Sequence, residues 1–168
     1  MRTPFRYLVV AVPPIALAVL AVLHLPAAAI PVFPLLGFAP WLVIRGFDAF
    51  LTWLVGILAV VYAFFSTAFV AGLFGPGSSL GFIGSAAFIA ACAITGLATF
   101  RRYGVLTLPG SVVVVIGSYL FLTSGIAVPV GLAGQLCIAV GWCAVLVAAG
   151  RSTERPAPKV DSGRQRGR

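Results

Sequence analysis

The chain has very little charge, and almost none of it is acidic. Only 8% of its 168 residues are charged, and Asp48, Glu154 and Asp161 are its three acidic residues. Soluble domains contain about 25% charged residues, so this composition excludes an ordinary soluble domain. The scarcity of internal acids and bases also disfavours most general acid–base catalysis and strongly ion-coupled pumping. A hydrophobic content of 61% and a mean hydropathy of +1.15 are typical of integral membrane proteins.

Residues that ligate metals and haem are also scarce. His24 is the only histidine, and the three cysteines, Cys92, Cys137 and Cys143, have no C-x-x-C spacing. A paired-histidine haem site and a histidine-rich metal site are therefore excluded within one chain. We interpret the cysteines as buried thiols that pack as small apolar groups, and we predict no metal and no cofactor.

One short motif matches a catalytic pattern. Residues 77–81, GSSLG, fit the G-x-S-x-G pattern of serine hydrolases, in which the serine needs a histidine base oriented by an acid. Here the motif falls in a glycine-rich segment between two predicted membrane helices, and no acidic residue is predicted on that side. We interpret it as a turn and predict a non-enzymatic protein. An intramembrane hydrolase using Ser79 and His24 is a remote alternative.

Long uncharged runs are the dominant feature of the chain. Apart from His24, residues 7–44, 49–100 and 103–150 carry no charge. One membrane span needs roughly 20 helical residues, and each run is about twice that length. Each run therefore predicts a helical hairpin. The predicted fold is an all-α membrane protein, a six-span helical bundle in residues 1–150, with spans at about 7–23, 27–44, 49–74, 80–100, 105–123 and 128–149.

The basic residues predict the orientation of this bundle. With three hairpins, all ten arginines and the single lysine fall on one side of the membrane. Lys and Arg are retained on the cytoplasmic side, so both termini are predicted to be cytoplasmic. Two alternatives stay open. One is a five-span protein with Arg2 and Arg6 outside, and the other is a signal peptide cleaved after the small residues 27–29.

Four prolines punctuate residues 26–45, which contain the second predicted span, namely Pro26, Pro31, Pro34 and Pro40. Proline removes a backbone donor and disfavours helix in the preceding residue. Lipid cannot satisfy the freed carbonyls, so this backbone must pack inside the bundle or line a wet cavity. We predict a broken helix that packs on its neighbours. The alternatives are a discontinuous helix beside a solute path and a segment that lies on the membrane surface.

A few polar residues are candidates for a hinge or a solute path. Arg45 and Asp48 are three residues apart, which predicts a local ion pair at the hinge between the first two hairpins. Asp48 is also a candidate for ion or proton coupling, because acids in membrane segments often mark pathways. Gln135 is the strongest polar group within a span, and it is a candidate for interhelical hydrogen bonds or for a solute path.

Small residues mark a predicted packing face on the last span. Ala133, Cys137, Gly141 and Ala148 fall on one stripe of that helix. Small side chains let helix backbones approach closely in a membrane. We predict packing within one chain, and the alternative is a seam between identical copies.

The end of the chain, residues 151–168, has a different composition. It holds six basic residues and almost no apolar ones, and it is predicted to be a disordered cytoplasmic tail. We expect it to contact anionic lipid headgroups. The sequence pI of about 10.5 is explained by topology and lipid contact rather than by nucleic acid, which we do not predict as a partner.

Two functions follow from these features. The first is a non-enzymatic accessory or interaction subunit of a membrane assembly. The alternative is a small transporter or channel for a neutral or apolar solute, with the broken second span and Gln135 near its path. The excess of arginine over lysine, together with abundant alanine, favours a GC-rich bacterial source and hence the bacterial cytoplasmic membrane.

Overall fold

The computed structural model describes residues 3–70, 79–124 and 129–153, and all regular structure within those ranges is helical. Long apolar stretches with isolated prolines form helices here because a helix satisfies its own backbone groups. The elements are α1 (Thr3–Val22), α2 (Pro26–Ala29), α3 (Val32–Ile44), α4 (Ala49–Val70), α5 (Ser79–Tyr103), the 3-10 helix η1 (Val105–Thr107), α6 (Leu108–Ser124) and α7 (Pro129–Thr153).

Within the described residues, five helical segments are long and apolar enough to cross a membrane. They are Ala27–Ile44, Ala49–Ala68, Gly81–Tyr103, Val105–Ser124 and Pro129–Ser152, while Tyr7–Val22 is a shorter apolar helix. These segments confirm the prediction of an all-α, membrane-embedded protein. The sixth span and the orientation of the termini stay predictions.

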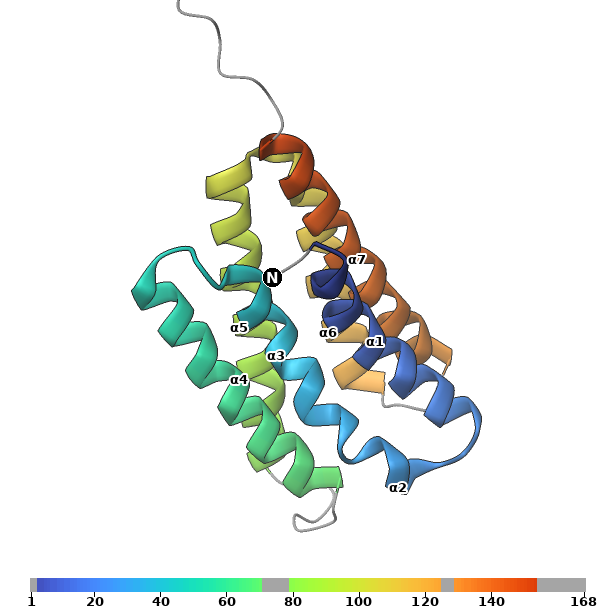
Figure 1. The fold of residues 1–168 in the computed structure, drawn as a ribbon. Helices are drawn as coiled ribbons and strands as arrows, with labels where there is room; N and C mark the ends of the chain where they lie inside the picture. Colours follow the sequence, from blue (N-terminus) through green and yellow to red (C-terminus); the bar gives the residue numbers. More distant parts are fainter. Residues whose placement is uncertain (1–2, 71–78, 125–128, 154–168) are drawn as a thin grey trace, which may run out of the picture.

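The helices form one bundle in which consecutive helices run in opposite directions. α6 packs along α7, α1 packs against α7 and α3, and α4 packs against α3 and α5 at the edge of the bundle. The connection between α3 and α4, the end of α5 and the end of α7 lie at one end of the bundle (Figure 1). The connection from α1 to α2 lies at the opposite end.

The bundle has a filled apolar interior. The largest fully buried side chains include Trp142, Tyr62 and Phe88, and the Tyr62 and Phe88 rings have centroids 4.7 Å apart. Phe33 of α3 stacks on Phe121 of α6 with centroids 6.1 Å apart. These contacts join α3, α4, α5 and α6 in the main core, and a second buried cluster on α3, α4 and α5 consists of Ile44, Val55, Ala91 and Ala98.

Glycines allow a close backbone contact between α6 and α7. A Cβ atom built on Gly134 would lie 2.7 Å from the carbonyl oxygen of Gly117 and 2.7 Å from the amide nitrogen of Phe121. Seven residues further along α7, a Cβ atom on Gly141 would lie 2.8 Å from the carbonyl oxygen of Gly110. Real Cβ atoms essentially never come so near, so the two backbones approach this closely only because both helices carry glycine here.

Only part of the packing stripe predicted on the last span lies at the contact between α6 and α7. Gly141 lies at the contact, and the Cβ atom of Cys137 would be 2.7 Å from a Cβ atom on Gly117. Ala148 is half-buried, and Ala133 is exposed. The glycine pairs therefore define the contact face, and two of the four residues of the stripe lie on it.

Candidate functional site

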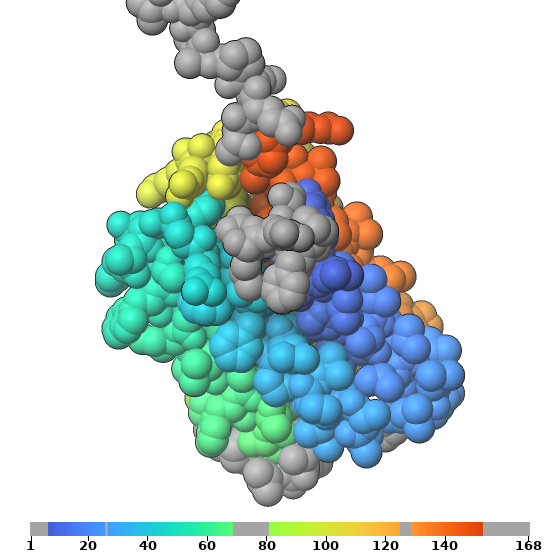
Figure 2. Space-filling view, viewed as in Figure 1, coloured from blue at the N-terminus to red at the C-terminus, as the bar shows by residue number. Residues whose placement is uncertain are grey.

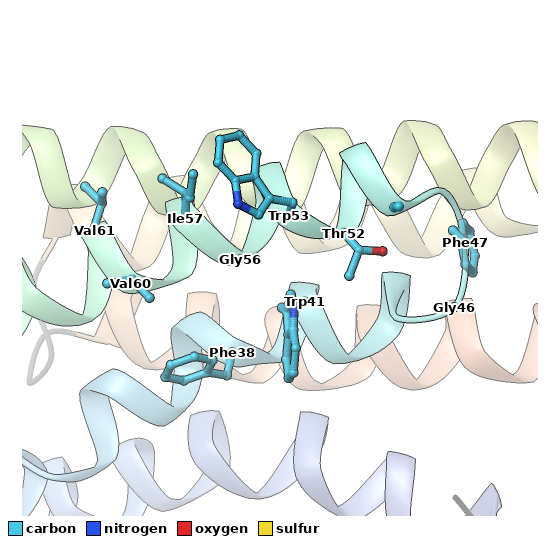
Figure 3. Close-up of a pocket in the computed structure, with 11 residues that line it drawn as sticks. Phe38, Trp41, Gly46, Phe47, Thr52, Trp53, Gly56, Ile57, Val60 and Val61 are labelled. Carbon is cyan, nitrogen blue, oxygen red and sulfur yellow. The ribbon is translucent and has the colours of Figure 1, made fainter.

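A groove lies between α3 and α4 on the outside of the bundle. Its volume is about 860 Å³, which falls in the range of small-molecule sites. The lining is almost wholly apolar, and Figure 3 shows Trp41 standing between the two helices. The lining residues are Phe38, Trp41, Gly46, Phe47, Ala49, Thr52, Trp53, Gly56, Ile57, Val60 and Val61.

Local sequence explains the shape of this groove. Gly56 leaves room for the Trp41 indole, because a Cβ atom there would lie 3.3 Å from both Cδ1 and Nε1 of that ring. Thr52 is the polar side chain of the lining, and its hydroxyl donates to the carbonyl oxygen of Asp48 at 2.8 Å. The groove therefore offers aromatic and aliphatic walls and little hydrogen-bonding capacity.

The α3–α4 connection closes one end of the groove, and Asp48 forms the start of α4 there. The Asp48 carboxylate accepts hydrogen bonds from the backbone N–H groups of Phe50 at 2.9 Å and Leu51 at 3.1 Å. This is an N-cap, which satisfies amides that have no partner within the helix. Arg45, which was predicted to pair with Asp48, has its guanidinium over the Trp41 ring, 5.4 Å from the ring centroid.

We expect the Asp48→Ala substitution to lower the free energy of unfolding by about 1 kcal/mol, because the first turn of α4 loses its cap. Thermal unfolding in detergent, followed by tryptophan fluorescence, measures the effect. Asp48→Asn is the matched control, since asparagine keeps the capping oxygen and loses the charge. A loss with Asn equal to the loss with Ala would show that the charge, and not the cap, is what matters.

Arginine and aromatic side chains gather at this end of the bundle. Arg102 donates from Nη1 to the carbonyl oxygen of Gly46 at 3.1 Å, and its guanidinium lies 4.4 Å from the centroid of the Phe47 ring. Phe47 packs edge-to-face on Tyr103, with centroids 5.6 Å apart. The Ser152 hydroxyl donates to the carbonyl oxygen of Tyr103 at 3.1 Å. These contacts tie the end of α5 to the α3–α4 connection and to the end of α7.

We call this region the basic end. Four exposed arginines belong to it, namely Arg45, Arg101, Arg102 and Arg151. Such a cluster of guanidinium groups and rings is typical of the level of lipid headgroups. The sequence named Arg45 as a hinge residue, but it did not indicate that Arg102 would reach Gly46, 56 positions earlier in the chain.

The residues considered for a solute path do not meet in this groove. Pro31 is exposed between α2 and α3, Pro34 is half-buried, and Pro40 is buried within α3. The carbonyl oxygen of Pro40 accepts from the Thr95 hydroxyl at 3.5 Å. Neither these prolines nor Gln135 line the groove.

Apolar side chains fill the inner face of α3, which a solute path beside the prolines would have to follow. Phe33, Leu36, Ala39 and Val43 are all at most 5% exposed and belong to the main core. Gln135 of α7 is fully buried, and its side-chain nitrogen and oxygen have no hydrogen-bond partner among the described residues.

The other residues singled out by sequence are dispersed. His24 is exposed at the end of the bundle opposite the basic end. Cys92 is buried, and its sulfur accepts from the Ser118 hydroxyl at 3.7 Å, while Cys137 and Cys143 are half-buried. The side chain of Ser79, residues 71–78, and the tail from residue 154 onward lie outside the described residues, so the turn and tail predictions are untested.

The outer surface of α4 is a feature that the sequence did not single out. Only 17% of the residues in its span are buried, compared with 39–44% in the other four long spans. Phe50, Ile57 and Phe64 are exposed on one side of α4, at intervals of seven residues, and we call them the outer α4 face. Figure 2 shows α4 at the edge of the molecule, with no other described helix over the part of it that is visible.

The chain matches no protein-family model, no curated protein and no solved structure in comparisons with each. No activity or partner is therefore carried over from a relative. The groove, the basic end and the outer α4 face are the features on which a function can be argued.

Proposed function

We propose that this protein is a non-enzymatic interaction subunit of a membrane assembly, and that a transmembrane helix of a partner protein packs on the outer α4 face. The low coverage of α4 relative to the other spans is the observation that supports this most directly. Aromatic residues are enriched in the cores of protein interfaces, and the outer α4 face carries two phenylalanines that are each 65% exposed. Seven-residue spacing is also the repeat with which two helices pack side by side.

We further propose six spans with both termini in the cytoplasm of a bacterial cell. α1 has 20 residues, which gives a length of about 30 Å, close to the thickness of a bilayer core. It packs against α3 and α7, and the connection that follows it lies at the end of the bundle opposite the basic end. The basic tail would then contact anionic headgroups on the cytoplasmic side.

The packing within the bundle favours this proposal over transport. A path for a polar or neutral solute beside the prolines needs open space along the inner face of α3, and apolar side chains occupy that space. Gln135 is fully buried and does not line the groove, so its position does not mark a solute path there.

Photo-crosslinking in native membranes tests the proposed interface. A photoreactive phenylalanine analogue at position 50 or 64 is expected to give one discrete cross-linked adduct, because a packed partner helix presents fixed neighbours. Mass spectrometry of the adduct identifies the partner, and an adduct of twice the chain mass would identify a second copy instead.

Matched control positions are Val140 and Leu8, which are 65% and 59% exposed on other helices. The same analogue there should give only lipid adducts. Lipid adducts alone at positions 50 and 64, or protein adducts of similar yield at all four positions, would contradict a specific interface on α4.

A further inference from the structure

We infer that the groove between α3 and α4 binds one anionic phospholipid, with an acyl chain lying along the groove and the phosphate held by Arg45 and Arg102. This inference does not require the proposed partner helix, because Phe50 and Phe64 of the outer α4 face do not line the groove, and only Ile57 belongs to both surfaces. The lipid site also differs from the expected headgroup contacts of the tail, because it is formed by α3, α4 and the end of α5.

The groove has the length and direction of an acyl chain. Its α4 wall extends from Ala49 to Val61, which corresponds to about 18 Å along the helix axis. It begins beside the α3–α4 connection at the basic end and runs along α4, away from that connection (Figure 3). A lipid tail anchored at the headgroup level would follow the same course.

The size and chemistry of the groove favour a flexible chain over a further helix. The groove has a volume of about 860 Å³ and lies between α3 and α4, which already pack against each other. That space is too small to admit a third helix, whereas a single hydrocarbon chain fits between the side chains of its walls. The groove offers almost no polar group, so its occupant along this length must be apolar.

Two arginines stand at the mouth of the groove, and both contact residues that line it. Arg45 lies over Trp41, and Arg102 lies over Phe47 and donates to Gly46. The hydrogen bond to Gly46 uses one of the five N–H donors of the Arg102 guanidinium, which leaves donors suited to phosphate oxygens. Asp48 is the nearby acid, and its carboxylate is engaged by two backbone amides at the positive end of α4.

The charge at the mouth selects anionic over zwitterionic lipid. A basic residue near the membrane surface strengthens binding of anionic lipid about fivefold, so two acting independently give about 25-fold. A zwitterionic headgroup brings a phosphate together with a cation, and it gains much less from the pair of guanidinium groups.

The test measures quenching of tryptophan fluorescence by brominated lipid in nanodiscs that hold the full chain. Trp41 and Trp53 line the groove, and the buried Trp142 is removed as Trp142→Phe to isolate the groove signal. Brominated phosphatidylglycerol is expected to quench at a lower mole fraction than brominated phosphatidylcholine. Inorganic phosphate should not displace the quenching, because the acyl chain supplies much of the binding.

Charge-matched double variants distinguish a site from diffuse attraction. Arg45→Gln with Arg102→Gln should weaken phosphatidylglycerol binding about 25-fold and abolish the preference over phosphatidylcholine. Arg101→Gln with Arg151→Gln removes the same charge at the same end and should retain the preference. Arg45→Gln alone leaves the Arg102 hydrogen bond in place and should weaken phosphatidylglycerol binding about fivefold. That result would show that the loss in the double variant does not come from misfolding of the α3–α4 connection.

Equal losses in the two double variants would overturn the site, since they would show a response to overall charge only. Equal quenching by the two brominated lipids in the unaltered protein would overturn it as well. Neither result bears on the cross-links at positions 50 and 64, so the lipid site and the partner interface can fail separately.

Discussion

Substitution of Gly134 by alanine is expected to destabilise the bundle, because the α6–α7 contact leaves no room for the added methyl group. The new Cβ atom would lie 2.7 Å from backbone atoms of both Gly117 and Phe121. Backbone cannot rotate away as a side chain can, so α6 and α7 would have to separate along their whole contact. Overpacking of this kind costs about 1–3 kcal/mol.

The control for this substitution lies on the same helix. A Cβ atom on Gly150 would have no heavy atom within 4 Å, so Gly150→Ala adds the same methyl group without a clash. Thermal unfolding in detergent should show a clear fall in midpoint for Gly134→Ala and none for Gly150→Ala. A midpoint for Gly134→Ala equal to that of the control would contradict the close contact between α6 and α7.

The double substitution of Gly117 and Gly134 by alanine adds a sharper test of the same contact. Once one methyl group has pushed the helices apart, the second meets less resistance, so the two costs should be less than additive. Simple additivity would show that the two glycines do not face each other.

Cysteine labelling of intact cells should give an all-or-none pattern across the two ends of the bundle. In a background without the three native cysteines, Leu25→Cys is expected to react with a membrane-impermeant maleimide. Val105→Cys is expected to react only after the membrane is opened, because it lies next to Arg101 and Arg102. Both side chains are exposed, at 49% and 67%, so access is decided by the side of the membrane.

A third cysteine distinguishes six spans from five. Thr3→Cys should be protected in intact cells if α1 crosses the membrane, and it should be labelled at once if Arg2 and Arg6 lie outside. Labelling of Val105→Cys in intact cells would refute the cytoplasmic assignment of the basic end altogether.

The site was predictable only in part. Arg45 and Asp48 could be placed at a hinge, because they are the charged residues that separate the first two uncharged runs. Their partners could not be predicted, because a cap and a cation–π contact are equally open to residues at this spacing. The groove itself depends on Gly56 facing Trp41, and that pairing is a matter of how α3 and α4 are rotated.

The sequence by itself determined that the chain forms long apolar helices, and it placed Arg45, Arg101, Arg102 and Arg151 at the ends of these helices and not in their interiors. These follow because a backbone in lipid must satisfy its own hydrogen bonds, and because arginine stays out of the bilayer core. Only the tertiary structure decided which face of each helix is covered. Lipid and protein interior are equally apolar, so hydrophobicity does not distinguish the buried side of a span from the exposed one. The Gly117–Gly134 contact, the uncovered α4 and the reach of Arg102 to Gly46 therefore depend on shape, which appears only when the helices pack together.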